Sequence, residues 1–242
     1  MILVLRGHIR KSFTTDKLKQ LIEWLILRYP NLVIYIHTWN LHSSGYSWRD
    51  VKDDRTEVNE ELINDYFGNL SKHIKHMIIE DDTSLELHGC MEGCVCKTQA
   101  PVVGWKRYWH GKYTIAKYLY DTVADLDTPV INTRFDLYQN GGLPDRVITK
   151  FLMRVCSRVY SNPQFVSDKT VPCIDNIYLS TVSMNYEIAK KFHFELDDIM
   201  ERNPDVVYQE VLLLYVCREL FNKNDILEKD IDRKIPGEIR WL

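Results

Sequence analysis

The stretch ILVLRGHIR at residues 2–10 begins with a continuous apolar run and turns polar at Arg6. A short run of this kind, Ile2–Leu5, is typical of a strand buried on both faces. An amphipathic helix should follow, because the segment Thr14–Asp16 can cap it and apolar residues then recur every three or four positions. Those positions are Leu18, Leu21, Ile22, Leu25 and Ile26. The start of the chain therefore predicts a buried strand that leads into a helix.

The same alternation of strands and helices continues to about residue 140. Further strands are predicted at Leu32–Ile36, His76–Ile79 and Val130–Thr133, with helices at about 57–72 and 105–121. Strands that alternate with helices favour an α/β fold, in which a mainly parallel central sheet is flanked by helices. We therefore expect a Rossmann-like α/β sandwich.

The second part of the chain has a less regular pattern. It predicts helices at Asp145–Val159, Met184–Phe192 and Tyr208–Phe221, and it allows a strand at Ile177–Ser180. No linker separates this part from the first. We expect a single domain over 1–242, with a ligand-binding half at 1–140 and a second half at 141–242.

The composition excludes several classes of protein. Among 242 residues, 45% are hydrophobic and the net charge is −3, which excludes a disordered or collagen-like chain. Without a long basic run, nucleic acid is not an expected partner. No stretch reaches the ~18 apolar residues of a transmembrane segment. Because the start also lacks a secretory signal, we expect a cytoplasmic protein.

Glycine is scarce in this chain and aromatic residues are common. There are 10 Gly against 14 Tyr, 8 Phe and 6 Trp. Neither G-x-x-x-x-G-K-[ST] nor G-x-G-x-x-G occurs, so the usual glycine-rich phosphate loops are excluded. A bound nucleotide would have to be held by side chains, with aromatic rings available for a sugar.

Polar side chains follow each of the four predicted strands. In α/β folds the ligand lies beyond the carboxyl ends of the strands, so these residues should meet at one edge of the sheet. Cations at two ends and acids at two ends fit an anionic ligand with a divalent metal. The residues are Arg6, His8 and Arg10; His37, Trp39 and Asn40; Asp81 and Asp82; and Arg134 and Asp136.

The segment VINTRFDLY at residues 130–138 resembles the strand and R-x-D-L motif of GT-A-type glycosyltransferases. Such enzymes occur in bacterial capsule and lipopolysaccharide clusters and in large DNA viruses, which would place a viral member in the host cytoplasm. The segments LRGHIR (5–10), IYIHTWN (34–40), SWR (47–49) and CIDN (173–176) look similar to the same group. So does GWKRYW at 104–109.

The resemblance implies transfer of a sugar from a UDP- or GDP-sugar to a hydroxyl of a glycan or glycoconjugate. It also implies that Asp136 binds Mn²⁺ or Mg²⁺, a hard cation that prefers oxygen ligands. The usual motif is D-x-D, and Arg134 replaces its first acid here. The site is therefore either metal-dependent through Asp136 or metal-free, with Arg134 contacting phosphate. A literal D-x-D at Asp125–Asp127 precedes the strand and is interpreted as a solvated turn.

Each remaining candidate residue has a possible functional role and a simpler structural alternative. Asp175, and second Glu210, are the candidates for the base that takes the acceptor proton in an inverting enzyme. Trp48 and Arg49 are expected in a loop near the acceptor or nucleotide. The alternatives are solvated loop positions for the charged residues and packing at the sheet edge for the aromatic ones. The nucleotide-sugar-binding candidates are Arg6, His8, Arg10, His37, Trp39, Asp81, Asp82, Lys106 and Arg134.

A cluster of soft ligands lies in the middle of the chain. His88, Cys90, Cys94 and Cys96 could hold a structural zinc ion, although the C-x-C spacing is tight and a surface loop with free thiols is the alternative. Two other functions stay open on this sequence. One is a nucleotidyltransferase, although only Gly7 follows the first strand where that class carries a glycine-rich loop. The other is a non-enzymatic, zinc-stabilised α/β binding module.

Overall fold

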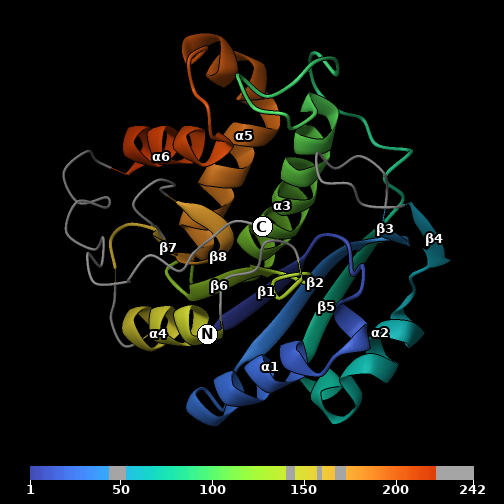
Figure 1. The fold of residues 1–242 in the computed structure, drawn as a ribbon. Coiled ribbons are helices and arrows are strands. Elements are labelled where there is room, and N and C mark those ends of the chain that lie inside the picture. Colours follow the sequence, from blue (N-terminus) through green and yellow to red (C-terminus); the bar gives the residue numbers. More distant parts are fainter. Residues whose placement is uncertain (44–52, 140–144, 157–159, 167–172, 222–242) are drawn as a thin grey trace.

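A computed structural model describes residues 1–43, 53–139, 145–156, 160–166 and 173–221 (Figure 1). Its centre is a six-stranded sheet with the order β5-β2-β1-β6-β8-β7. The first four of these strands are parallel, and β8 runs antiparallel to both β6 and β7. The strands are β1 (Ile2–Arg6), β2 (Val33–Trp39), β5 (Ile74–Glu80), β6 (Pro129–Arg134), β7 (Gln164–Val166) and β8 (Ile174–Thr181). A separate antiparallel pair is formed by β3 (Leu41–Ser43) and β4 (Asp54–Glu57).

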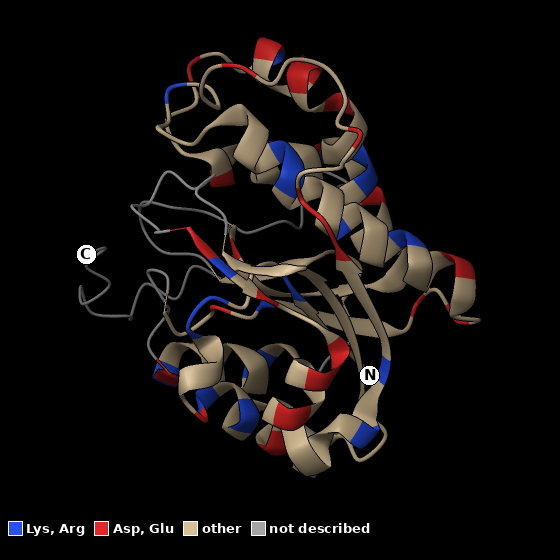
Figure 2. Ribbon diagram, turned by 90° about the vertical axis from the view of Figure 1, so that its right-hand side faces the viewer, with Lys and Arg blue, Asp and Glu red and all other residues tan. Residues whose placement is uncertain are grey.

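Helices cover both faces of the sheet, so the structure is an α/β sandwich with a mixed, mostly parallel sheet (Figure 1). In Figure 2 the strands are largely tan, and the charged residues lie mainly at strand ends and on the helices. One face carries α1 (Lys17–Arg28), α2 (Glu60–Phe67) and α4 (Asp145–Val155), and the other carries α3 (Val102–Thr122), α5 (Val182–Arg202) and α6 (Gln209–Leu220). Short 3₁₀ helices lie at η1 (Ser12–Thr14) and η2 (Gly68–His73). No helix in the described ranges is long and apolar enough to cross a membrane.

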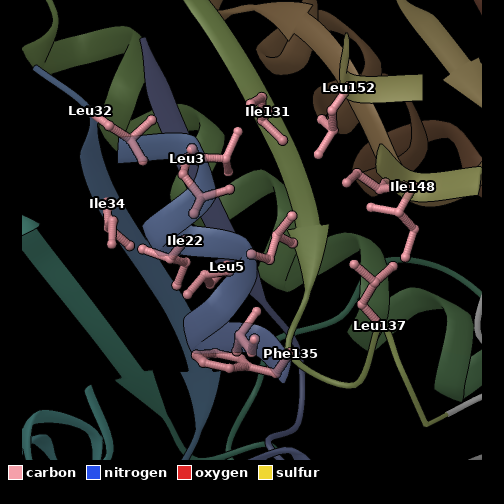
Figure 3. Close-up of a cluster of buried hydrophobic side chains, with 14 of the residues drawn as sticks. Leu3, Leu5, Ile22, Leu32, Ile34, Ile131, Phe135, Leu137, Ile148 and Leu152 are labelled. Atoms are coloured by element: carbon pink, nitrogen blue, oxygen red, sulfur yellow. The ribbon is translucent and has the colours of Figure 1, made fainter. Parts of the chain in front are cut away.

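Strand β1 is buried on both faces, which explains its continuous apolar sequence. Leu3 and Leu5 pack with Ile22 of α1 and with the side chains of α4 (Figure 3). Ile2 and Val4 point the other way and pack in a cluster with residues of α3. Because side chains alternate along a strand, Arg6 continues the face that meets α3. The strand thus delivers a cation to the interface between the sheet and α3.

Most predicted elements are confirmed, with shifted ends. The helix predicted over 57–72 is wrong at its end, because α2 stops at Phe67 and Gly68 adopts a positive φ of 54° before a 3₁₀ turn. Asp175 lies inside β8, which begins before the strand predicted at Ile177–Ser180. The strands β3, β4 and β7 were not predicted. Asp125 accepts hydrogen bonds within an exposed turn before β6, as expected for the literal D-x-D.

Strands from both sides of residue 140 belong to the same sheet, since β8 pairs with β6. The strand order changes direction between β1 and β6: β2 and β5 extend the sheet one way, and β6 and β8 the other. In α/β folds such a switch point opens a crevice at the carboxyl ends of the strands. The register places Arg6 opposite both Arg134 of β6 and His37 of β2 at this edge.

Candidate functional site

A cleft of about 130 Å³ lies at the switch point. It is formed by the carboxyl ends of β1, β2 and β6, the amino end of β8 and one side of α3. This space accommodates the phosphate part of a larger ligand, and the rest of such a ligand would extend out of the cleft, since whole drug-sized ligands need about 300 Å³ or more. The lining residues are Arg6, Gly7, His8, Arg10, His37, Trp39, Asp82, Ala100, Pro101, Gly104, Trp105, Arg107, Tyr108, Gly111, Lys112, Arg134, Asp175 and Gln209.

The cleft is cationic although the whole chain carries a charge of −3. Its lining contains four Arg and one Lys against two Asp. Burial lowers the pKa of His8 to about 4, so this ring is neutral near pH 7. Burial also lowers the pKa of His37. The ion pairs of Arg10 and Arg134 with Asp136 offset part of this charge. The described lining keeps a modest excess of positive charge in a poorly solvated place, which favours an anionic ligand.

Arg6 is 2% exposed and is fixed by partners from two other strands. Its Nε donates to Asn132 Oδ1 at 2.5 Å, and its Nη2 donates to the backbone oxygen of Asp175 at 2.6 Å. Its guanidinium lies 4.7 Å from the centre of the Tyr108 ring. Nη1 is buried and has no hydrogen-bond partner among the described residues. Arg6 is thus held rigidly with one donor unused.

Lys112 is 1% exposed, and its Nζ likewise has no hydrogen-bond partner in the described part of the chain. The ammonium lies 3.9 Å from the ring centre of Trp109, 4.8 Å from that of Tyr178 and 5.2 Å from that of Tyr108. Burial lowers the pKa of Lys112 well below its usual value, and the nearby Arg6 lowers it further. The neighbours of Nζ are mainly aromatic rings, which do not accept conventional hydrogen bonds, so its N–H groups remain available to a ligand.

Asp175 is one of the two acidic residues that line the cleft. Tyr108 donates its hydroxyl to Asp175 Oδ2. Burial alone would raise the pKa of Asp175, but Lys112 and Arg6 outweigh it and hold the pKa below its usual value. The carboxylate therefore stays ionised, and its lowered pKa makes it a weak base. Its role as the catalytic base stays a prediction.

Asp136 is 2% exposed and lies between two guanidinium groups. Arg134 binds it in a fork, with Nε 2.7 Å from Oδ1 and Nη2 2.9 Å from Oδ2. Arg10 Nε lies 3.4 Å from Oδ2, and Arg10 itself has a positive φ of 52°. A left-handed φ at a non-glycine residue is strained and is more frequent at functional sites. Arg134 and Asp136 of the R-x-D motif thus form a bidentate ion pair at the edge of the sheet where the cleft opens.

The carboxylates at this edge do not form a suitable set of ligands for Mn²⁺ or Mg²⁺. Both oxygens of Asp136 accept from Arg134, Asp175 accepts from Tyr108, and Asp82 Oδ2 lies 3.2 Å from Arg107 Nη1. No group of three or more His, Cys, Asp or Glu suited to a metal is found within the described ranges. A divalent cation would also have to enter a positively charged lining. The role of Asp136 as a metal ligand stays a prediction, and the donor set does not favour it.

The two acids after β5 have different positions. Asp82 is buried in the cleft, where Arg107 binds it and His8 Nε2 lies 4.0 Å from Oδ2. Asp81 is exposed and accepts from Thr83 in its own turn, which lowers its pKa. Of this pair, the structure brings only Asp82 to the predicted site.

His37 and Trp39 lie at the cleft but are buried. His37 Nε2 lies 2.6 Å from Glu80 Oε2, and its ring meets Trp39 edge-on at 4.9 Å. A Cβ atom on Gly111 would lie 2.5 Å from the His37 ring, so only glycine allows α3 to approach β2 this closely. The packing role weighed for these aromatic side chains is therefore present, and contact with a base or sugar stays a prediction.

Two other candidates lie away from the cleft lining. Lys106 is buried on another side of α3, where its Nζ lies 2.7 Å from Asp197 and donates to the His88 backbone oxygen. Glu210 lies in the first turn of α6, and it is the neighbouring Gln209 that lines the cleft. Trp48 and Arg49 lie outside the described residues.

The proposed zinc ligands do not gather around one point. His88 packs against His193 and Phe194, and both Cys90 and Cys94 are exposed. As noted above, the described residues contain no metal-binding group of this kind. All six cysteines are free thiols. The zinc hypothesis gains no support from this geometry.

Sequence reasoning missed Tyr108, Lys112 and Gln209. A signal for Lys112 was present, because it interrupts the apolar stripe of α3 formed by Trp105, Trp109 and Ala116. A lysine on the buried face of a helix is rare unless it has a partner or a function. Tyr108 lies one turn before it and therefore on the same side of the helix.

Comparisons of this chain with protein-family models, curated proteins and solved structures find no match. The likeness to GT-A-type glycosyltransferases therefore stays a prediction from short motifs. What can be argued about function rests on the cleft and its side chains.

Proposed function

We propose that this chain is a GT-A-type glycosyltransferase that moves a sugar from a nucleoside diphosphate sugar to a hydroxyl of a glycan or glycoconjugate. The observation that carries the proposal is the cationic cleft at the switch point between β1 and β6. A ligand with two linked phosphates matches its charge, and the position is where α/β folds bind nucleotides. The resemblance of residues 130–138 to the R-x-D-L motif of GT-A-type glycosyltransferases indicates sugar transfer as the reaction class.

The chemical contribution of the cleft is to stabilise a leaving diphosphate. Negative charge develops on that group as the glycosidic bond breaks, and fixed donors in a poorly solvated site lower the barrier. Arg6 and Arg134 lie side by side on neighbouring strands and are held by Asn132 and Asp136. Their positions are therefore set before the ligand arrives.

The runner-up is a nucleotidyltransferase, which would use the same edge of the sheet. The two classes differ in the group that leaves. A glycosyltransferase releases a nucleoside diphosphate, whereas a nucleotidyltransferase releases pyrophosphate from a nucleoside triphosphate. No contact in the cleft favours the second class, and only Gly7 stands where its glycine-rich loop is expected.

The test incubates purified full-length protein with a panel of UDP- and GDP-sugars and pooled glycan acceptors. Released nucleoside diphosphate is measured with EDTA and with Mn²⁺. Pyrophosphate release from nucleoside triphosphates is measured in parallel, with sugar 1-phosphates as acceptors of the nucleotidyl group. We expect nucleoside diphosphate release from at least one donor. Pyrophosphate release alone would favour the nucleotidyltransferase, and release of neither product would refute both.

A pair of arginine variants links any activity to the cleft. Arg134→Gln removes a lining cation, and Arg202→Gln removes an exposed one from α5. We expect the first to reduce release about tenfold or more, as for a lost charge-assisted contact to phosphate. The second should leave release unchanged. Equal activity of both variants would separate the reaction from this cleft, provided that both melt cooperatively.

A further inference from the structure

Two cations in the cleft have donors that the protein does not use. Nη1 of Arg6 and Nζ of Lys112 are buried and lack a hydrogen-bond partner among the described residues. Both residues line the cleft, and both lie against the Tyr108 ring. A buried donor without a partner is costly, and these two belong to cationic side chains that meet in one cleft. Such donors are expected where a ligand supplies the missing acceptors.

We propose that Arg6 and Lys112 form an inner subsite that binds a phosphate group of the donor directly, without a metal ion. This inference rests on the proposed function. It assigns to Arg6 and Lys112 the binding of the diphosphate, which a metal ion would otherwise perform at that site. The ligand class is a phosphate-type dianion. Guanidinium and ammonium donors are the side chains most used for this group.

Other ligand classes fit the subsite less well. A neutral hydroxyl would accept from one donor and leave the excess charge in place. A metal ion would face only the N–H groups of Arg6 and Lys112. These groups have no lone pair with which to coordinate it. The nearest carboxylate, Asp175, already accepts from Tyr108. Only an anion satisfies both unused donors and neutralises the charge that they carry.

The charged groups around Lys112 indicate a proton-linked binding step. Those that face it are Arg6 on β1, Arg134 on β6, Asp175 on β8 and Cys217 on α6. Burial raises the pKa of Cys217 to about 12, and Asp175 stays ionised, so neither changes charge between pH 6 and 9. An anion next to Lys112 favours its protonated form. Affinity for the anion should therefore fall as the pH rises.

The experiment titrates inorganic pyrophosphate into the full-length protein by calorimetry in EDTA. Lys112→Met is compared with Lys117→Met, which removes an exposed lysine from the same helix. We expect wild-type protein and Lys117→Met to bind pyrophosphate equally, and Lys112→Met to bind it about tenfold or more weakly. Equal binding by all three proteins, or binding that requires Mn²⁺, would overturn the proposal.

A second measurement needs no variant and guards against a misfolded one. Sulfate remains a dianion between pH 6 and 9, so its affinity for the wild-type protein reports protonation of the subsite. We expect the affinity for sulfate to decrease across this range in EDTA, and a flat profile would count against Lys112.

The two proposals fail in different ways. Pyrophosphate binding in EDTA without turnover of any nucleotide sugar would retain the subsite and reject the glycosyltransferase. Sugar transfer that depends strictly on Mn²⁺, with no pyrophosphate binding in EDTA, would retain the glycosyltransferase and reject the subsite.

Discussion

Replacing Lys112 by Met should stabilise the protein while weakening its anion binding. Methionine has a similar length and no charge, so it can fill the space between Trp109, Tyr178 and Tyr108 without a buried donor. In the wild-type chain the Nζ has no hydrogen-bond partner among the described residues and lies 3.9 Å from the Trp109 ring centre. A group that binds ligand at a cost to the fold should behave in this way.

The size of the effect follows from two opposing contributions. An unsatisfied buried donor costs about 1–3 kcal/mol. The substitution also loses the attraction between ammonium and rings, about 0.5–2 kcal/mol, but sulfur–aromatic contacts of about 0.3–1.5 kcal/mol replace most of it. We therefore expect a net gain of about 1–2 kcal/mol in the free energy of unfolding. For a chain of this length that is a rise in Tm of about 2–8 °C.

The gain should depend on pH with a defined sign. Burial holds the pKa of Lys112 in the folded state well below the unfolded value of about 10.4. Between the two pKa values the unfolded chain binds more protons, so wild-type stability rises with pH. The free-energy cost of burying the charged Lys112 is therefore fully present below its pKa in the folded state and is lost as the pH approaches about 10.4. The advantage of Lys112→Met should be larger at pH 6 than at pH 9.

Urea denaturation of wild type, Lys112→Met and Lys117→Met at pH 6 and pH 9, without phosphate or sulfate, measures these differences. Lys117 pairs with Asp121 on the surface of α3, so its replacement should change stability by less than about 0.5 kcal/mol. Destabilisation of Lys112→Met by more than about 1 kcal/mol at both pH values would refute the reasoning. It would mean that Lys112 supports the fold, and the unused donor would no longer point to a ligand.

Two further substitutions test the contacts around the cleft. Gly111→Ala should destabilise by about 1–3 kcal/mol in thermal or urea unfolding, because its Cβ would lie 2.5 Å from the His37 ring. Alanine otherwise gains about 1 kcal/mol over glycine inside a helix, so stabilisation would contradict this contact. Tyr108→Phe removes the hydrogen bond that helps to keep the pKa of Asp175 low. A carboxyl whose pKa is lowered by folding stabilises the protein at neutral pH, and this stabilisation disappears in acid. We therefore expect Tyr108→Phe to lower the free energy of unfolding by about 1.5–3 kcal/mol at pH 7 and by less towards pH 3. A loss that is equal at both pH values would assign Tyr108 a packing role only.

The sheet and most helices could be predicted because their signals are local. The apolar run Ile2–Leu5 and the strand at Val130–Thr133 are buried on both faces, and this burial is visible in the residues themselves. Arg6 and Arg134 could be placed at one edge because parallel strands end together. The antiparallel direction of β8 could not be predicted, since it depends on pairing with β6 over more than 40 residues of chain. Asp175 was therefore not placed in a strand, although β8 carries it to the same edge from the opposite direction.

The helix α3 shows why part of the site escaped the sequence. Its buried face contains aromatic residues and a lysine, and hydrophobic periodicity treats that lysine as an interruption. Only the packing of α3 against the sheet, with Gly111 on His37, shows that Lys112 faces Arg6 rather than water. Lys106, six residues and nearly two turns earlier, is also a lysine of this helix but pairs with Asp197 on another side. Helix phase, set by tertiary packing, distinguishes the two.

On our proposal Arg134 stands where the D-x-D motif has its first acid, and this has a consequence beyond the absence of one oxygen ligand. An acid at this position would leave two carboxylates close together, and their repulsion would favour a bound cation. With arginine, the second acid is neutralised by its own neighbour, since both oxygens of Asp136 accept from Arg134. The edge of the sheet then holds surplus positive charge instead of negative charge. On our proposal the task of binding a diphosphate passes to Arg6 and Lys112, and restoring the acid should reverse it. Arg134→Asp is therefore expected to create Mn²⁺ dependence in pyrophosphate binding, whereas binding that remains independent of metal would show that Arg134 does not control the charge of the site.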